Sequence, residues 1–424
     1  MRSGIFSLAA AGVLFAATAA AQAASDKRAV LETYADIAHA GYEDSLVLAR
    51  ELQTSIKTLI VTPSAESLAA ARNAWLASRV PYMQTEVYRF GNAVVDDWEG
   101  KVNAWPLDEG LIDYVAKSYG TTSEENPVYA ANVIANASLK LGGSVIDAKR
   151  ITKALLQDEL HEFGDVEANV ATGYHAVEFL LWGQDLNGTG PGAGARPWTD
   201  YARGGDCTNG NCDRRAEYLS TVTDLLVDEL AWMTAQWAPD GPARQELLAG
   251  DPDKGIAVIL TGLGSLSYGE LAGERMKLGL LLHDPEEEHD CFADNTHNSH
   301  YFDVVGMLNV YTGSYARIDG RKVVGMSLAH LVAKASPALN AEMLSRLRHS
   351  EATMAALKLR AETVEAYDQM IGPDNPEGNA VVQTAIDALT TQTQTIEAIV
   401  AELGLQPIAF EGSDSLDDPE AVFQ

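Results

Sequence analysis

The sequence lacks several features that mark well-defined classes of protein. It has three cysteines and 15 prolines in 424 residues, and it has 30 Lys and Arg against 60 Asp and Glu. No Cys-x-x-Cys-His occurs, so covalent haem attachment is not indicated. There is also no Gly-x-Ser-x-Gly, Walker loop or dinucleotide fingerprint to support a hydrolase, a nucleotide site or a redox cofactor. The formal net charge of −30 disfavours nucleic-acid and anionic lipid partners. The excess acid attracts cations, although the solubility of an exported protein explains it equally well.

The one long apolar run of the sequence lies at its N-terminus. Arg2 precedes an apolar stretch over residues 5–20, and the small-residue box Ala21-Gln22-Ala23 follows it. This pattern predicts a secretory signal peptide over residues 1–23, cut after Ala23. No later stretch approaches the ~18 uninterrupted apolar residues that a membrane helix requires. We therefore expect an exported protein of the periplasm or cell envelope that does not span the membrane.

The cysteines are too few for a disulfide scaffold. Cys207 and Cys212 flank the loop Thr-Asn-Gly-Asn, and in an oxidising compartment such a pair closes a small disulfide loop more readily than it binds a metal. Cys291 is left unpaired.

The pattern of apolar residues predicts an all-α fold. Ala, Leu and Glu are abundant, and β-branched runs of period two are scarce, so three-and-four spacing dominates. Helices are expected over residues 25–59, 65–90, 130–160, 166–182, 214–237, 255–282, 301–308, 342–370 and 381–403. Two irregular stretches, residues 184–213 and 283–298, interrupt the pattern, and loops of that length usually carry function or mobility.

The length predicts two domains, because about 400 mature residues exceed what one core supports. We place a first helical bundle at residues 24–240 and a second at 241–424. Weak internal similarity suggests that the two bundles are related: residues 85–97 can be laid on residues 273–285, and the segment from His175 on that from Asn298. Chance similarity between amphipathic helices explains these matches as well.

The segment Gly-Tyr-His-Ala-Val-Glu, residues 173–178, is the most informative motif. His175 and Glu178 stand three residues apart on a predicted helix, so both side chains lie on one face. Imidazole and carboxylate together suit divalent iron, zinc or manganese. An isolated pair of this kind arises readily by chance, and a site needs further ligands.

Five segments together resemble the imelysin-like family, also called the iron-regulated protein A group. They are residues 72–91, 103–108, 173–178, 273–279 and 284–297, and the resemblance covers nearly all of the mature chain. It implies two related α-helical bundles, a shared G-x-H-x-x-E motif and a cell-envelope location. Members of this family were first classed as metallopeptidases, and iron acquisition is now the favoured role. The motif residues are Gly173, His175 and Glu178, and all three are present.

The residues favour metal binding over peptidase chemistry. No H-E-x-x-H occurs, since His161-Glu162 is followed by Asp165 where the second histidine should stand. The inverted form H-x-x-E-H also fails, because Phe179 follows Glu178. A zinc site would still be possible if a third ligand came from another helix.

Glu86 is the best candidate for that third ligand. Helical bundles of the di-iron type combine Glu and Glu-x-x-His from facing helices, and Glu86 lies on a predicted helix. The alternative is an ion pair with Arg79 or Arg89. Asp108, like Asp96 and Asp97, is a weaker candidate that serves equally well as a helix cap or solvated acid.

Other candidates are second ligands or supporting groups. Glu270 and Glu274 face the same way and form either a buried ion-pair network with Arg275 or part of the site. Tyr174 could offer its hydroxyl to a bound ion, and Arg79 could hold a carboxylate-bearing chelate.

The acidic segment 284–300 could capture cations through His289 or His297. We expect it instead to be a solvated loop in which Asp294 or Asn295 caps the next helix.

These patterns predict an exported metal-binding protein, with iron as the metal and iron uptake as the role. The expected partners are a metal ion or iron chelate and an envelope iron-transport component. A zinc-dependent metallopeptidase and a non-catalytic envelope interaction protein are the alternatives. No catalytic or organic-cofactor residue is assigned.

Overall fold

The computed structural model describes residues 6–123, 126, 128–141 and 143–423, and it confirms the all-α prediction. The longer helices are α1 (Phe6–Val61), α2 (Ala65–Met83), α3 (Ala93–Asn103), α5 (Gly173–Trp182), α6 (Cys212–Trp237), α7 (Pro242–Ala249), α8 (Pro252–Ser265), α10 (Thr296–Thr312), α11 (Leu328–Ala335), α12 (Pro337–Thr363) and α14 (Pro376–Glu402). Shorter helices are α4 (Glu109–Ile112), α9 (Leu278–Leu282), α13 (Tyr367–Ile371) and α15 (Asp414–Asp417). Two stretches are π-helical, η3 (Leu155–Leu160) and η7 (Leu266–Lys277). The 3₁₀ turns that bear on the site are η1 (Glu86–Tyr88), η8 (Pro285–Glu287) and η9 (Cys291–Ala293).

Several helices of the second half begin at a capping residue followed by proline. The pairs are Asp251-Pro252 at α8, Ser336-Pro337 at α12 and Asn375-Pro376 at α14, and each capping side chain accepts a backbone N–H of the first turn. Proline suits the first helical position because its missing N–H would have no partner there. The sequence thus specifies where these helices start.

The helix expected over residues 130–160 is wrong. Within the described part, this stretch forms turns and a small antiparallel hairpin of β1 (Ser138–Leu141) and β2 (Ser144–Asp147), with only η3 helical. Gly143 takes a φ of 87° at the turn, a conformation that interrupts a helix. A second hairpin pairs β3 (Ser314–Ala316) with β4 (Lys322–Val324).

The other predicted helices are present with shifted ends. The stretch expected at residues 166–182 becomes helical only at Gly173, and the one expected at 342–370 is interrupted between Thr363 and Tyr367. The two irregular stretches are found where the pattern breaks, although α10 already begins at Thr296. The predicted Cys207–Cys212 disulfide is confirmed, and Cys291 is a free cysteine.

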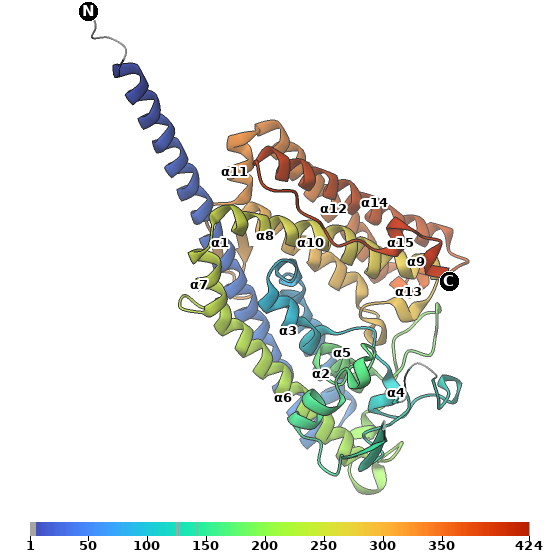
Figure 1. Ribbon diagram of the computed structural model, residues 1–424. Helices are drawn as coiled ribbons and strands as arrows, with labels where there is room; N and C mark the ends of the chain where they lie inside the picture. The colour runs from blue at the N-terminus through green and yellow to red at the C-terminus, as the bar shows by residue number, and fades with distance from the viewer. Residues whose placement is uncertain (1–5, 124–125, 127, 142, 424) are drawn as a thin grey trace, which may run out of the picture.

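The helix α1 includes most of the predicted signal peptide. Its N-terminal part stands clear of the rest of the protein, and its later part packs along α2 and α6 (Figure 1). Residues 1–5 lie outside the described residues, and cleavage after Ala23 stays a prediction.

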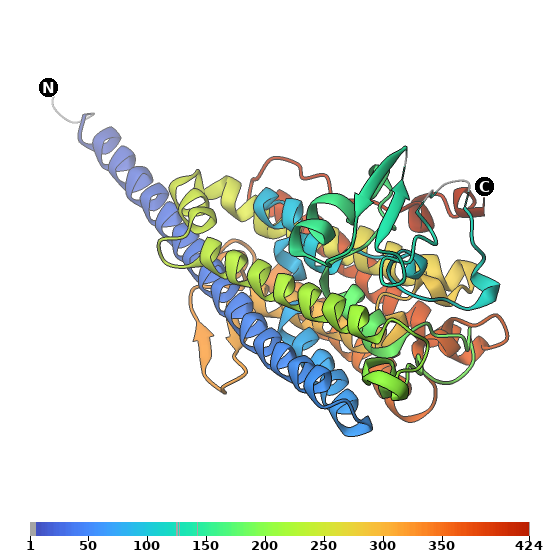
Figure 2. The same ribbon diagram turned by 90° about the horizontal axis from the view of Figure 1, so that it is seen from below.

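Two groups of helices lie side by side. The first contains α1, α2 and α6, and the second contains α8, η7, α10, α12 and α14, as the colours from blue to red show in Figure 2. The helix α10 packs on α2 and so joins the groups. The division of the chain at residue 240 stays a prediction.

Glycines bring the two groups into backbone contact. A Cβ at Gly262 of α8 would lie 2.2 Å from the Val87 carbonyl oxygen, and one at Gly306 of α10 would lie 2.5 Å from the Gln84 carbonyl oxygen. Only glycine lets the backbones approach so closely. The segment from Gln84 to Tyr88 is therefore held between α8 and α10.

One described helical stretch is long and apolar enough to cross a membrane by length and composition. It is Pro252–Leu282, with a mean hydropathy of 1.3, and 72% of its most apolar window is buried inside the protein. Buried core helices pass the same test, and this stretch packs against α14.

Candidate metal centre

The helix α5 places the G-x-H-x-x-E motif in the interior. It packs against α2, α3, α6 and the turn η9, and all ten of its residues are buried. Gly173 starts the helix with a φ of 81°, and a Cβ there would lie 2.5 Å from the Val102 carbonyl oxygen. The motif therefore needs glycine at this position, both for the backbone conformation and for the close approach of α3.

We expect Gly173→Ala to lower the free energy of unfolding by about 2–4 kcal/mol, because the methyl group adds a clash to an unfavourable φ. Gly164→Ala is the matched control, since Gly164 has a φ of 74° but nothing within 4 Å of the added Cβ. Chemical denaturation of both variants measures the difference. Equal losses in the two variants would show that the contact with Val102 is unimportant.

His175 and Glu178 are hydrogen-bonded to each other. His175 Nδ1 lies 2.9 Å from Glu178 Oε2, and Glu178 Oε1 accepts the Ala293 N–H at 2.9 Å. Both carboxylate oxygens are therefore engaged, whereas His175 Nε2 is buried without a hydrogen-bond partner among the described residues. In this arrangement Glu178 orients the imidazole and His175 offers its free nitrogen. A carboxylate behind a ligating histidine is the usual support of a metal-bound imidazole.

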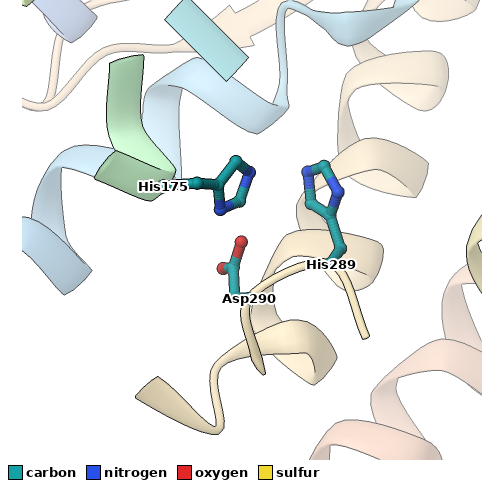
Figure 3. Close-up of side chains that lie close together, drawn as sticks. All are labelled: His175, His289 and Asp290. Atoms are coloured by element: carbon teal, nitrogen blue, oxygen red, sulfur yellow. The ribbon is translucent and has the colours of Figure 1, made fainter. Parts of the chain in front are cut away.

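Two residues from the segment after α9 complete a group of possible ligands. One ligand atom from each of His175, His289 and Asp290 lies within 4.8 Å of the others, and all three residues are buried. The two imidazole rings meet edge to face, with centroids 4.8 Å apart and an angle of 75° between their planes, and the Asp290 carboxylate points toward His175 (Figure 3). His289 was a candidate from the sequence, while Asp290 was not.

The Asp290 carboxylate is held by Arg79. Arg79 Nη2 donates to Asp290 Oδ1 at 2.8 Å, and the other oxygen accepts from Asn295 at 2.7 Å and from Ser299 at 2.5 Å. Arg79 also donates to Asn103 Oδ1 at 2.6 Å and lies over the Tyr174 ring, 5.0 Å from its centroid. The centre therefore contains a buried cation of its own.

Burial keeps the two histidines neutral. It lowers the pKa of His175 to about 3, with the Arg79 charge acting in the same direction, and it lowers the pKa of His289 well below the ordinary value. Burial likewise raises the pKa of Glu178 far above its usual range, and the nearby Asp290 adds to the effect. Neutral imidazoles are the form that binds metals.

Glu86 is placed in a different cluster. Its Oε2 accepts from Arg275 at 2.6 Å, and Arg275 also contacts Glu270 at 2.7 Å and Asp303 at 3.2 Å. Arg89 joins the cluster through Glu270 at 3.3 Å. The ion-pair alternative for Glu270 is what the structure shows, and the partner of Glu86 is Arg275 rather than Arg79 or Arg89.

The remaining predicted residues are scattered. Tyr174 is buried on α5, where its ring supports Arg79 and its backbone oxygen accepts from Trp75 Nε1 at 3.0 Å. Asp108 accepts a hydrogen bond from Asn126 and is not part of the group formed by His175, His289 and Asp290. His297 contacts Asn298.

An acidic cleft of about 630 Å³ leads to the centre. Glu274 lines it, and so do His289 of the metal centre and Asn103, whose side-chain nitrogen lies 3.4 Å from His289 Nε2. The other charged residues of its lining are Arg89, Asp96, Glu99, Glu162, Glu167, Glu270, Arg275 and Glu287. Acids outnumber bases in this lining, so the cleft attracts cations toward His289.

The prediction that the acidic segment 284–300 is a solvated loop is wrong in its central part. Glu288, His289 and Asp290 are buried, and Asn295 occupies the cap position of α10 without a side-chain cap hydrogen bond. One signal was present in the sequence, because residues 284–297 form one of the five segments that resemble the imelysin-like family.

The comparison with known proteins agrees with this architecture. The Imelysin family model (Peptidase M75) matches residues 38–396. The chain belongs to the imelysin family. The iron-regulated protein A of Synechococcus elongatus is 23% identical over 416 residues, covering 95% of this chain and 94% of that one. The crystal structure of an iron-regulated protein A precursor from Parabacteroides distasonis has a TM-score of 0.64 at 17% identity, covering 90% of this chain and 95% of that one, and it shows the fold.

The residues of the centre fit a transition metal. Two neutral imidazoles and one carboxylate form the donor set of many iron and zinc sites. The unpartnered His175 Nε2 would hold the ion, with His289 and Asp290 as the other ligands.

Proposed function

We propose that this imelysin-family chain is an exported metal-binding protein that holds iron at His175, His289 and Asp290 during iron uptake. The observation that carries the proposal is that one ligand atom from each of these three buried side chains lies within 4.8 Å of the others, and that His175 Nε2 has no hydrogen-bond partner among the described residues. A buried polar atom without a partner is costly, so it calls for a ligand.

The surrounding residues would support capture in three ways. The acids of the cleft raise the local concentration of cations beside His289. Glu178 fixes the ring of His175 through the 2.9 Å contact with Nδ1. An arriving positive charge also favours the ionised form of Glu178, so binding would release a proton.

Iron and export are supported by the relatives and by the sequence. The matching protein of Synechococcus elongatus is named iron-regulated, and the structural relative is described as a precursor. The signal-peptide pattern at residues 1–23 agrees with export. A site of two histidines and one carboxylate suits Fe²⁺.

A zinc-dependent peptidase is the second candidate, because the same donor set holds catalytic zinc. Its weakness is the general base. Both oxygens of Glu178 are engaged, and Asp290 is tied to Arg79. Binding is therefore the function that the geometry supports better.

Metal titration of the purified mature protein tests the proposal. After chelation, anaerobic Fe²⁺, with Co²⁺ as a spectroscopic probe, should bind at one site, and His175→Ala or His289→Ala should weaken binding at least ~100-fold. Glu178→Gln should weaken it by ~10- to 100-fold, the usual effect of removing a carboxylate behind a ligating histidine.

His349→Ala is the control, because His349 lies exposed on α12. It should bind as tightly as the unchanged protein. Equal affinity in His175→Ala, or no binding by the unchanged protein, would refute the proposal. Metal-dependent cleavage of unfolded substrates that disappears in His175→Ala would favour the peptidase instead.

A further inference from the structure

A second group of acids surrounds a small cavity beside the segment that carries His289. The cavity has a volume of about 10 Å³, close to the space that one water molecule requires. Its lining includes five acids from four separate segments: Glu109 of α4, Asp185 after α5, Glu286 and Glu288 around η8, and Asp368 of α13. Among the described residues, the lining contains no lysine, arginine or histidine.

Two of these acids are buried and present oxygen atoms without partners. Glu288 is 1% exposed; its Oε2 accepts from Thr296 at 2.8 Å, but its Oε1 has no hydrogen-bond partner among the described residues. Asp368 is 2% exposed, and neither of its carboxylate oxygens has one. Both residues line the cavity.

The acids also repel one another. Burial and neighbouring acids raise the pKa of Glu109 and Asp368 to about 7 and that of Glu286 to about 6. The charges that shift Glu286 are Asp284, Asp185 and Glu287, which are all acids. The clusters around Asp290 and Glu86 each contain an arginine that pairs with their carboxylates, and the lining of this cavity does not. A bound cation would supply the missing positive charge.

We propose that this cavity is a binding site for a hard divalent cation, with Ca²⁺ as the best fit, and that Glu288 and Asp368 are its central ligands. Calcium takes six to eight oxygen ligands and accepts carboxylates in one- or two-oxygen contacts from flexible surroundings. The acids around the cavity offer such oxygens from several segments. Mg²⁺ demands stricter octahedral geometry and retains its water, so the closely crowded acids suit it less.

The site would also stabilise the metal centre. Glu288 directly precedes His289 and Asp290, which are two of the three residues of the metal centre. A cation that fixes Glu288 against α13 therefore fixes the backbone that presents His289. The two sites remain chemically distinct, because one is built from oxygen alone and the other from imidazoles.

Calcium titration of the chelated mature protein at pH 8 tests this site. Ca²⁺ at a hundred times its dissociation constant should raise the melting temperature by about 5 °C, whereas equal Mg²⁺ should raise it less. Asp368→Asn and Glu288→Gln should each weaken calcium binding at least tenfold. In the absence of calcium the same variants should melt no lower than the unchanged protein, because each removes a repelling charge.

Asp147→Asn is the matched control, since the side chain of Asp147 is 68% exposed on β2. It should keep the full calcium response, and so should His175→Ala, which separates this site from the metal centre. If Glu288→Gln and Asp368→Asn fail to fold, Glu286→Gln replaces them, because Glu286 is exposed and also lines the cavity, and it should weaken calcium binding. An unchanged protein that ignores calcium, or acid variants that bind it as tightly as Asp147→Asn does, would overturn the proposal. The acids would then be kept uncharged by protonation alone.

Discussion

Arg79→Met is expected to destabilise the metal-free protein by about 3–5 kcal/mol and, at the same time, to tighten metal binding at least tenfold. The loss of stability follows from Asp290, which would remain buried with only neutral donors. The gain in affinity follows from electrostatics. A guanidinium paired with the carboxylate that binds a divalent ion would repel that ion by several kcal/mol at an effective dielectric constant of ~20. Arg79 also holds the very carboxylate that the ion would use.

The two effects are measured separately. Chemical denaturation of the chelated protein gives the loss of stability, and Co²⁺ titration gives the change in affinity. Arg72→Met is the control, because Arg72 lies on the same helix and donates to the backbone oxygens of Leu181 and Arg196. Its affinity for Co²⁺ should not change. Weaker binding in Arg79→Met would mean that the arginine supports the metal centre rather than competing with it.

Asp113→Ala is expected to cost about 3–5 kcal/mol for a different reason. The Asp113 carboxylate accepts hydrogen bonds from Arg215 Nε at 2.6 Å and from Arg196 Nη1 at 2.7 Å, and all three side chains are buried. Burial disfavours its ionised form, but the two arginines outweigh that effect and lower its pKa. Removing the carboxylate leaves Arg215 without its side-chain acid and Arg196 with Asp200 alone.

The matched control for this prediction is Asp36→Ala. Asp36 also pairs with an arginine, Arg244, at 2.5 Å, but its side chain is 51% exposed. Water and side-chain entropy reduce the contribution of such pairs to about 0–1 kcal/mol. Urea denaturation should therefore separate the two alanine variants by at least ~2 kcal/mol. Similar midpoints would show that the buried network contributes little.

The sequence predicts local structure well where the determinants are local. The small disulfide loop depends on neighbouring residues and was predicted. The helices α8, α12 and α14 were expected from residues 255, 342 and 381, which is three to five residues late, because apolar spacing alone does not register their Asp-Pro, Ser-Pro and Asn-Pro starts. The pairing of His175 with Glu178 follows from helical spacing alone. The failed helix over residues 130–160 shows the limit, because its periodicity was helical while Gly143 specified a turn.

The sequence predicts less of the charged interior, because its partners are far apart in the chain. Arg275 and Glu86 are separated by 189 residues, and Arg79 and Asp290 by 211. Spacing rules reach only three or four residues, so Glu86 could be given a helical position but not a partner. The role of Asp290 depends in the same way on the fold that brings it to His175.

The glycine contacts at Gly262 and Gly306 bear on how the proposed metal ion would be exchanged. At these two glycines the helix backbone lies directly against the backbone of residues 84–88, and no long side chain between them could change its rotamer to allow sliding. A hinge motion that separates the two helix groups would have to break these backbone contacts. The proposed metal ion would then enter and leave through the acidic cleft without a relative movement of the two helix groups. Its dissociation rate would depend on protonation of the ligands or on a competing chelator.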